Sequence, residues 1–392
     1  MSRTARAALG DWCYHVFNRG NARSETTSPK TRFAVIGLGH FAQSAILPAF
    51  ANATDKASLA ALVTGDSEKA AQLSKQYKAP AFRYEDYDRL MKSGDIDAVY
   101  IALPNSHHRE FTERAARAGI HVLCEKPLAY NAADAQAMIG ACQAADVQLM
   151  TAYRLHFEEG NLQAIETVHS GRIGEPRLFN SIHTMQVDPG NIRVDRELGG
   201  GPLEDIGVYC INAARYLFRA EPEEVVAFAA MGTEPRFHEV PESVSATMRF
   251  PGGRLATFLC GFGQEKVSEY RVVCTEGSLL MNPAYTWHGD IKQTLIIEDK
   301  EIPRTFKHRD QIAAEILYFA DCVQCGNDPE PSGREGLIDV RIIEALRTSY
   351  TKHVPVHIDP LPKQERPDAS QSIRRSPPAE PKTVNVDSPS KG

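Results

Sequence analysis

No stretch of this 392-residue chain approaches the roughly 20 consecutive apolar residues that a membrane-spanning helix needs. Residues 1–30 are polar and contain no apolar core, so they lack the pattern of a secretory signal. The formal net charge is −6, which provides no excess of cations for nucleic acid or an anionic membrane surface. The sequence therefore predicts a soluble protein whose partners are neither membranes nor nucleic acids.

Paired metal-ligand motifs are also missing. Cys322 and Cys325 form one CxxC, but no second pair and no neighbouring histidines complete a zinc site, so no metal is expected. A chain of this length needs no cross-links to stabilise its core, and its 8 scattered cysteines indicate reduced thiols. The predicted location is the cytoplasm.

Between Arg32 and Ala152, short continuous apolar runs alternate with segments of helical spacing. The runs lie at 33–36, 59–63, 98–102, 122–124 and 148–152, and the helical segments at 41–50, 68–76, 110–118 and 132–145. Continuous apolar strands separated by helices predict a parallel sheet covered on both faces. The fold class is therefore α/β, and residues 31–153 are predicted to form an N-terminal Rossmann domain with a doubly wound parallel sheet.

The pattern changes after Arg154. Longer segments alternate apolar and polar residues at 177–185, 223–231, 243–250, 253–261, 269–275, 277–281 and 293–298. Such alternation is typical of an antiparallel sheet, so residues 154–359 are predicted to form a second α/β domain with a large, open, mainly antiparallel sheet. Residues 1–30 are expected to be a flexible arm, and residues 360–392, rich in Pro, Ser, Lys and Asp, a disordered tail.

The first predicted strand leads into a glycine-rich turn, Gly37-Leu38-Gly39-His40-Phe41-Ala42, which opens a helix. Gly37 permits the tight turn, and Gly39 lets the backbone approach a pyrophosphate that the helix N-terminus stabilises. A strand before this motif and a helix after it favour dinucleotide binding over a turn that only packs.

The residue that ends the second strand selects the cofactor, because NAD enzymes usually place an acid there to bind the ribose 2′-hydroxyl. Here Thr64 and Gly65 occupy that position and Lys69 lies nearby, so a 2′-phosphate would meet no repulsion. Asp66 argues for NAD unless it caps the helix that begins near Glu68. We predict NADP, with NAD less favoured.

Two further strand ends carry polar residues. Leu103-Pro104-Asn105 is followed by His107 and His108, and Glu125-Lys126-Pro127 follows the next strand. The carboxyl ends of parallel strands meet the crevice that holds the cofactor, and a proline, in either a trans or a cis bond, fixes the backbone after Lys126. Lys126 is therefore predicted to point into that crevice, whereas the two histidines fit a helix start equally well.

These motifs, together with Gly199-Gly200-Gly201-Pro202-Leu203-Glu204-Asp205-Ile206-Gly207-Val208-Tyr209, resemble the Gfo/Idh/MocA oxidoreductase family. The resemblance spans about Thr31 to Asp359. Within the family, the chain is most similar to the glucose–fructose oxidoreductase subgroup, through Ala61–Gly65, Pro104-Asn105-Ser106 with His108, Tyr153-Arg154 with His156, and Asp205–Tyr209. That enzyme is periplasmic and has a twin-arginine signal, which residues 1–30 lack.

The resemblance implies NAD(P)-dependent conversion between an alcohol and a ketone on a sugar or polyol, and an open sheet that packs on another subunit in a homodimer or homotetramer. It places the catalytic roles on Lys126, Asp205 and Tyr209. We assign to the cofactor Gly37, Leu38, Gly39, His40, Phe41, Thr64, Gly65, Lys69, Leu103, Pro104, Asn105, His108, Glu125, Lys126 and Arg154. We assign to the substrate His156, Asn161, Arg196, Asp205 and Tyr209.

The residue types fit this chemistry independently. A hydride leaves a carbinol carbon only as the hydroxyl proton departs, so a base is needed near that oxygen. Free tyrosine has a pKa of about 10, and a neighbouring lysine cation favours tyrosinate and stabilises the developing alkoxide. Asp205 would orient Lys126 or hold a sugar hydroxyl, and Gly199-Gly200-Gly201 fits either close approach to the substrate or a flexible hinge.

Two alternatives remain at the sequence level. One is a trans-dihydrodiol or inositol-type dehydrogenase of the same family. The other is a non-catalytic NADP-sensing regulatory protein, against which the presence of Lys126, Asp205 and Tyr209 argues, since a sensor needs no acid–base set.

Overall fold

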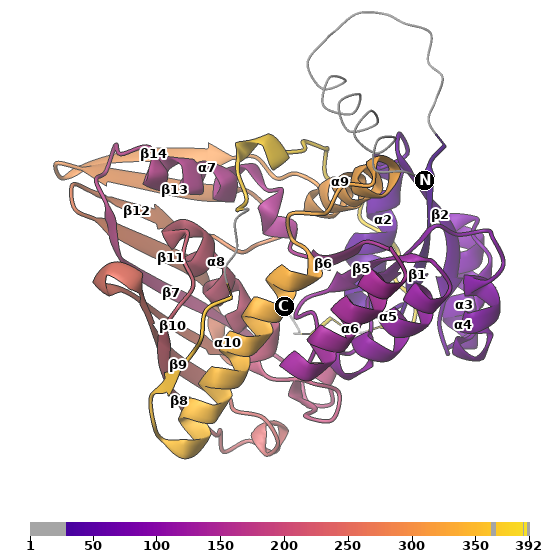
Figure 1. Cartoon of the computed structure of the whole chain (residues 1–392), viewed down its shortest axis with the longest axis horizontal. Helices are drawn as coiled ribbons and strands as arrows, with labels where there is room; N and C mark the ends of the chain where they lie inside the picture. Colours follow the sequence, from indigo (N-terminus) through magenta and orange to yellow (C-terminus); the bar gives the residue numbers. More distant parts are fainter. Residues whose placement is uncertain (1–28, 362–365, 387, 390–392) are drawn as a thin grey trace, which may run out of the picture.

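The computed structural model describes residues 29–361, 366–386 and 388–389. Nearly all of the predicted N-terminal arm lies outside these residues. The described chain forms two sheets that stand side by side, with helices between and around them (Figure 1).

The first sheet confirms the predicted Rossmann domain. Its six parallel strands are β1 (Thr31–Ile36), β2 (Ala57–Val63), β3 (Ala81–Phe82), β4 (Ala98–Ile101), β5 (His121–Glu125) and β6 (Leu149–Ala152). They lie in the order β3-β2-β1-β4-β5-β6, the doubly wound arrangement that places a ligand crevice at the carboxyl ends of β1 and β4. The connecting helices are α2 (Leu47–Ala49), α3 (Ser67–Tyr77), α4 (Tyr87–Met91), α5 (His108–Arg117) and α6 (Ala132–Ala144).

Both faces of this sheet are buried, which explains its continuous apolar strands. Side chains of α4, α5 and α6 cover one face, where Phe111 and Met138 pack near Ile36. The other face is covered in part by α9 (Gln311–Cys325), whose Phe319 contacts Phe33. Because α9 comes from beyond residue 154, the chain returns to the first domain after building most of the second.

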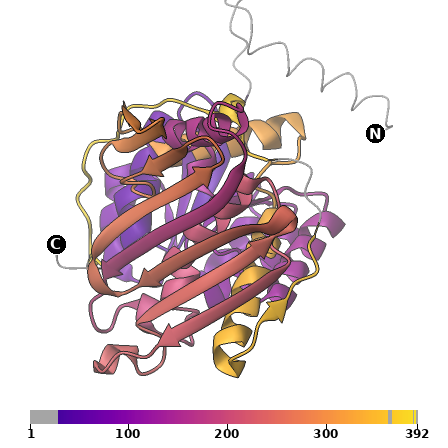
Figure 2. The ribbon, with the colours of Figure 1, turned by 90° about the vertical axis from the view of Figure 1, so that its left-hand side faces the viewer.

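The second sheet has nine strands and is antiparallel except where β7 and β10 pair in parallel. Its strands are β7 (Pro176–Gln186), β8 (Glu224–Ala230), β9 (Ser243–Phe250), β10 (Arg254–Gly261), β11 (Gly263–Cys274), β12 (Ser278–Met281), β13 (Ile291–Ile297), β14 (Lys300–Phe306) and β15 (Val356–His357). Helices α7 (Glu159–His169), α8 (Val208–Phe218) and α10 (Gly333–Lys352) cover one face. The opposite face is open (Figure 2) and carries apolar side chains that are 37–69% exposed, namely Leu178, Phe228, Leu255, Leu259 and Val273.

The prediction of a disordered C-terminal tail is wrong for residues 366–386 and 388–389. This segment extends over both domains and contributes Val384, only 8% exposed, to the core that contains Phe33 and α9. Its composition offers too little apolar surface to fold alone. It is ordered because an existing surface supplies hydrogen-bond partners, such as Asn52 for the Ser376 carbonyl at 2.8 Å.

No helix in the described ranges is long and apolar enough to cross a bilayer. Nor do the described His, Cys, Asp and Glu side chains form a group of three or more that could hold a metal ion. Of the cysteines among the described residues, six are free and buried and Cys325 is disulfide-bonded, so the expectation that every thiol is reduced is wrong at Cys325.

Candidate active site

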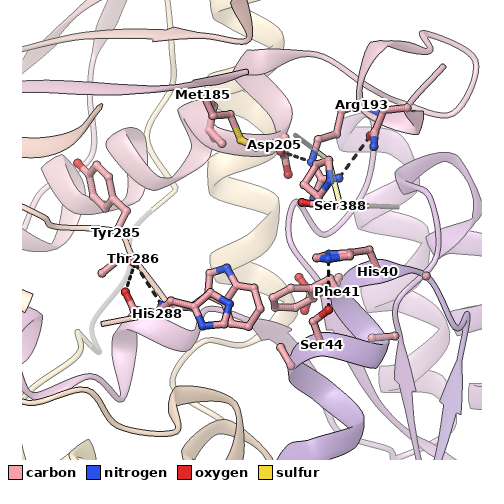
Figure 3. A pocket seen from close by; sticks show the side chains of 18 of the residues that line it. His40, Phe41, Ser44, Met185, Arg193, Asp205, Tyr285, Thr286, His288 and Ser388 are labelled. Carbon is pink, nitrogen blue, oxygen red and sulfur yellow. Dashed lines mark hydrogen bonds and ion pairs between the residues drawn. The ribbon is translucent and has the colours of Figure 1, made fainter. Parts of the chain in front are cut away.

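A cavity of about 2010 Å³ lies between the carboxyl ends of the Rossmann strands and the nine-stranded sheet (Figure 3). Pockets for a single small ligand usually measure about 300–1,000 Å³, so this one has room for a dinucleotide and a second molecule. Its wall combines the glycine turn, the ends of β4 and β5, the loop after β7, residues 282–288 and the C-terminal segment.

The glycine turn fits a dinucleotide. A Cβ at Gly37, where φ is +90°, would lie 2.5 Å from the Ala102 carbonyl oxygen, so only glycine lets the turn pack against the end of β4. A Cβ at Gly39 would meet no atom within 4 Å, which leaves its backbone open to a pyrophosphate. Gly39, His40 and Phe41 line the cavity, whereas Gly37 and the buried Leu38 shape the turn from behind and are not part of the wall.

A smaller hollow of about 450 Å³ lies at the end of β2. Thr64 and Gly65 line it as predicted, but Lys69 does not, because the wall uses the face of α3 that carries Ser67, Ala70, Ala71 and Ser74. Arg83, which sequence reasoning missed, supplies a cation instead.

Asp66 caps α3, which was one of the two roles considered for it. Its carboxylate accepts hydrogen bonds from the backbone N–H groups of Lys69 at 3.0 Å and Glu68 at 2.8 Å. The bond from Lys69 is the main reason that the pKa of Asp66 is lowered. The acid that argued for NAD is therefore engaged in capping.

The end of β4 brings Leu103, Pro104 and Asn105 to the cavity as predicted. His108 is fully buried and stays outside the wall. Its ring nitrogens lie 3.0 Å from the Leu103 carbonyl oxygen and 3.1 Å from that of Pro127, and burial lowers its pKa. His108 thus ties the β4 and β5 loops together from outside the cavity wall, and its assignment to the cofactor stays a prediction.

Lys126 enters the cavity at the end of β5, and its peptide bond to Pro127 is cis. The ammonium donates to the Asp205 carboxylate at 3.0 Å and to the Asp205 carbonyl oxygen at 2.7 Å. It also lies 4.9 Å from the centroid of the Tyr209 ring. Although burial alone would lower the pKa of Lys126, electrostatic interactions, the largest of them with the Asp205 carboxylate, raise it, so this residue is a cation at neutral pH.

Asp205 is held from two sides. It lies in a π-helical turn, Leu203–Gly207, that leads into α8, a type of turn found frequently at functional sites. Arg193 donates to its second carboxylate oxygen at 2.7 Å. Burial would raise the pKa of Asp205, but the neighbouring cations Arg193 and Lys126 hold it well below its usual range.

Tyr209 has a second cation beside it. The Arg154 Nε donates to the Tyr209 hydroxyl oxygen at 3.2 Å, and the guanidinium carbon lies 4.9 Å from the ring centroid. Arg154 is only 4% exposed and donates further hydrogen bonds to the Gln311 side chain and to the Tyr285 carbonyl oxygen. Arg154 lines the cavity as predicted, and it also contacts the catalytic candidate Tyr209.

Three predicted substrate residues do not reach the cavity. His156 is 1% exposed and lies between Glu330 at 2.7 Å and Asn212 at 2.8 Å. Asn161 is fully buried, where it donates to the Glu158 carboxylate at 2.8 Å. Arg196 is exposed and outside the wall. The structure does not bring these three side chains to the cavity, because two are satisfied inside the second domain and the third turns outward, and their assignment to the substrate stays a prediction.

Arg193 takes the position expected of Arg196, three residues earlier in the same loop. The glycine run packs this loop tightly: a Cβ at Gly200 would lie 2.4 Å from the Arg193 carbonyl oxygen. One at Gly199 would lie 2.8 Å from Asn105. The run therefore brings the loop against β4 and Arg193 against Asp205.

The second sheet and the segment after β12 supply wall residues that sequence reasoning missed. His183, Tyr285, Thr286, Trp287 and His288 all line the cavity. Burial lowers the pKa of His183 to about 3, so its ring is neutral. Trp287 meets Phe41 of the glycine turn edge to face, with ring centroids 5.6 Å apart. No spacing in the sequence signals these positions, because they converge only when the sheet faces the Rossmann domain.

This geometry defines a dinucleotide-dependent oxidoreductase. A glycine turn open to a cavity and a buried lysine cation beside a tyrosine suit reaction at an alcohol or carbonyl carbon. The chain belongs to the Gfo/Idh/MocA oxidoreductase family. The model of its NAD-binding Rossmann fold matches residues 31–153, and the GFO/IDH/MocA C-terminal domain matches residues 161–280. The resemblance seen in the motifs is confirmed.

Several relatives of this chain are named for reactions on sugars. It is 32% identical to D-xylose 1-dehydrogenase (NADP(+)) of Haloarcula marismortui, over 88% of this chain and 98% of that protein. The crystal structure of aldose-aldose oxidoreductase from Caulobacter crescentus is similar with a TM-score of 0.81 and 37% identity, over 84% of this chain and all of that one. A 3-ketoreductase from Actinomadura kijaniata, solved with NADP and TDP-benzene, has a TM-score of 0.76 and 28% identity, over 82% and 98% of the chains.

Proposed function

We propose that this protein is an NADP-dependent oxidoreductase that interconverts an alcohol group of a sugar and the corresponding carbonyl, with catalysis by Lys126, Tyr209 and Asp205. The observation that carries the proposal is the contact of the Lys126 cation with both Asp205 and the Tyr209 ring, in a cavity that also contains the open glycine turn. Sugar-oxidising and sugar-reducing relatives support the substrate class.

Residues of this chain fit the cofactor at two places. The Gly39 backbone, with His40 and Phe41, would hold the pyrophosphate, and Thr64, Gly65 and Arg83 would surround a 2′-phosphate. When bound, the nicotinamide supplies the hydride acceptor or donor. NADP in the names of the xylose dehydrogenase and the ketoreductase structure supports this cofactor.

Tyr209 acts as the acid–base group in this proposal. Because Arg154 Nε already donates to the Tyr209 oxygen, the hydroxyl proton is free to move between that oxygen and a sugar hydroxyl. Lys126 stabilises negative charge on the reacting oxygen, and Asp205 fixes the position of the lysine. Arg193 completes this arrangement through its bond to Asp205.

The direct test is the absorbance of reduced nicotinamide when purified protein and NADP are mixed with aldoses, among them D-xylose and D-glucose. We expect reduction of NADP by at least one aldose, and reduction slower by on the order of 10²–10⁴ with a Lys126→Met variant. A trans-dihydrodiol belongs in the same panel, because a trans-1,2-dihydrobenzene-1,2-diol dehydrogenase of Danio rerio is 29% identical over 62% of this chain. Turnover of the diol alone would replace the sugar in this proposal, and failure with every substrate would refute it.

We also propose that the protein is a homodimer or homotetramer built on the open face of the nine-stranded sheet. Leu178, Leu255 and Val273 pair across neighbouring strands there, and Phe228 is 69% exposed. An apolar face of this kind marks an interface. Light scattering should give a multiple of the 43.3 kDa chain mass, and Leu255→Glu should lower it. A native mass equal to one chain would exclude the assembly.

The cytoplasmic location stays a proposal. Six free, buried cysteines support a reducing compartment, whereas the disulfide at Cys325 favours an oxidising one. Counting free thiols in protein taken directly from cells, with and without reductant, separates the two.

A further inference from the structure

The C-terminal segment forms part of the wall of the cofactor cavity. We call residues 376–386 and 388–389 the C-terminal strap. Nine of its residues line the cavity together with the glycine turn and the catalytic candidates: Pro378, Ala379, Glu380, Pro381, Thr383, Asn385, Val386, Ser388 and Pro389. Figure 2 shows the segment, in yellow, running along one side of the molecule, and Figure 3 shows Ser388 on the same side of the cavity as His40 and Arg193.

The strap is anchored at the glycine turn itself. The fully buried side chain of Gln43 accepts a hydrogen bond from the Val384 N–H at 2.7 Å and donates one to the Val384 carbonyl oxygen at 3.0 Å. The same amide nitrogen also donates to the Leu38 carbonyl oxygen at 2.9 Å. One side chain therefore joins the strap to the turn that is expected to hold the pyrophosphate.

Beyond Val384 the strap joins the two ends of the cavity. The Asn385 side chain donates to Glu68 at 2.8 Å and to Asp66 at 3.4 Å, next to the hollow lined by Thr64 and Arg83. At its far end the Pro389 carbonyl oxygen accepts from the Asp188 N–H at 2.8 Å, in the loop after β7. The strap thus spans from the proposed 2′-phosphate site to the second domain.

We propose that the C-terminal strap is a binding element for NADP, which closes the cavity over the bound dinucleotide and slows its release. The inference rests on the proposed function, because it takes the dinucleotide to be the occupant. The cavity measures about 2010 Å³ with the strap in place, so the strap adds a wall without filling the space. A dinucleotide covered in this way must leave by detaching a segment that is fixed at Gln43, Glu68 and Asp188.

Retention of the cofactor has a consequence for the reaction sequence. If release is slow, dissociation of the cofactor limits the rate at which NADP from solution is reduced.

The test compares NADPH release from three forms of the protein. One form ends at Arg375 and lacks the strap, a second carries Val384→Asp, and the control carries Lys382→Ala. Val384 is 8% exposed in a hydrophobic core, so a carboxylate there should undock the strap without shortening the chain. Lys382 is exposed and lies outside the cavity wall. Each form is loaded with NADPH and mixed with a large excess of NADP, and the loss of bound-NADPH fluorescence gives the release rate.

We expect release to be faster by about tenfold or more in the truncated and Val384→Asp forms, the effect of losing roughly one or two hydrogen bonds, and unchanged in Lys382→Ala. Their equilibrium affinity for NADPH should fall in parallel. Equal release rates in all forms would overturn the inference. Tighter NADPH binding after truncation would also overturn it, because the strap would then hinder cofactor binding. No sugar enters this assay, so its result is independent of the substrate panel. If the protein were inactive on every sugar but released NADPH faster without the strap, the proposed function would be refuted and the role of the strap in cofactor retention would be supported.

Discussion

Lys126 and Asp205 meet through two atoms of the aspartate. The ammonium contacts the carboxylate at 3.0 Å and the backbone carbonyl oxygen of the same residue at 2.7 Å. Two acceptors on Asp205 fix the lysine relative to the start of α8, whose second residue is Tyr209, four positions after Asp205. The contact therefore couples the end of a Rossmann strand to a helix of the second domain, and both proposed catalytic groups depend on it.

Removing either Lys126 or Tyr209 should disable the reaction to a similar extent. Lys126→Met keeps much of the side-chain stem but removes the cation, and Tyr209→Phe removes only the hydroxyl. We expect each to lower kcat by on the order of 10²–10⁴, and the double variant to be little worse than either, because groups that act as a unit are non-additive. NADP affinity, measured by fluorescence, should persist in all three. A single variant with near-normal kcat at saturating substrate would contradict the proposed roles.

Arg193 should matter for catalysis, and Arg196, three residues away, should not. Arg193→Gln removes a cation that lowers the pKa of Asp205, so that pKa should rise and the acid limb of the kcat profile should move to higher pH. We expect kcat near neutral pH to fall by about tenfold, as for loss of a charged hydrogen bond. Arg196→Gln is the matched control and should behave as wild type. Equal profiles for the two variants would exclude a positioning role for Arg193.

The cation that favours NADP over NAD should be Arg83 rather than Lys69. Arg83→Ala should weaken NADP binding by about tenfold and leave NAD binding nearly unchanged, since only NADP carries the 2′-phosphate. Lys69→Ala, the control, should change neither affinity, because Lys69 does not line the hollow at Thr64. Titration of both cofactors by fluorescence quenching measures this. Thr64→Asp should shift the cofactor preference toward NAD, because its carboxylate repels the 2′-phosphate. If neither Arg83→Ala nor Thr64→Asp changed the preference, the 2′-phosphate would bind elsewhere.

A buried carboxylate pair should make stability depend on pH. The Tyr100 hydroxyl lies 2.7 Å from Glu315 and 2.9 Å from Glu125, and its one proton cannot serve both. Burial, reinforced by the charge of Glu125, raises the pKa of Glu315 well above 4.5, while the Arg154 cation acts in the opposite direction. The folded protein therefore holds a proton that the unfolded chain releases. Stability falls as pH rises from 4.5 toward the folded pKa.

Glu315→Gln replaces the titrating carboxyl group by an amide that does not ionise. We expect the variant to melt roughly 2–4 °C above wild type at about pH 8, where the unfolded wild-type chain has ionised Glu315 and ionisation in the folded state is penalised by burial, and no higher at about pH 4.5. Glu276→Gln, at an exposed position, is the control and should melt as wild type at both pH values. A difference between Glu315→Gln and wild type that did not change with pH would contradict the prediction.

The sequence by itself determined the Rossmann domain, because each of its signals is local. Continuous apolar strands predict burial on both faces, and Gly37 and Gly39 permit a turn that other residues would block. Lys126 was found for the same reason: the end of a parallel strand must face the crevice. The motif that includes Asp205 and Tyr209 was recognised by resemblance to a family, not from its spacing.

Tertiary structure decided which polar side chains face the cavity. Three polar side chains at promising positions in the chain are satisfied by buried partners instead, namely His108, His156 and Asn161. Arg193 rather than Arg196 reaches Asp205, because the glycine run sets the path of the loop. The C-terminal strap is the largest such difference. Its composition predicts disorder because it cannot bury enough apolar surface alone. Gln43 and the core around Val384 provide the missing partners. The surface to which the strap binds forms only after both domains have folded, so the strap sequence alone does not specify it.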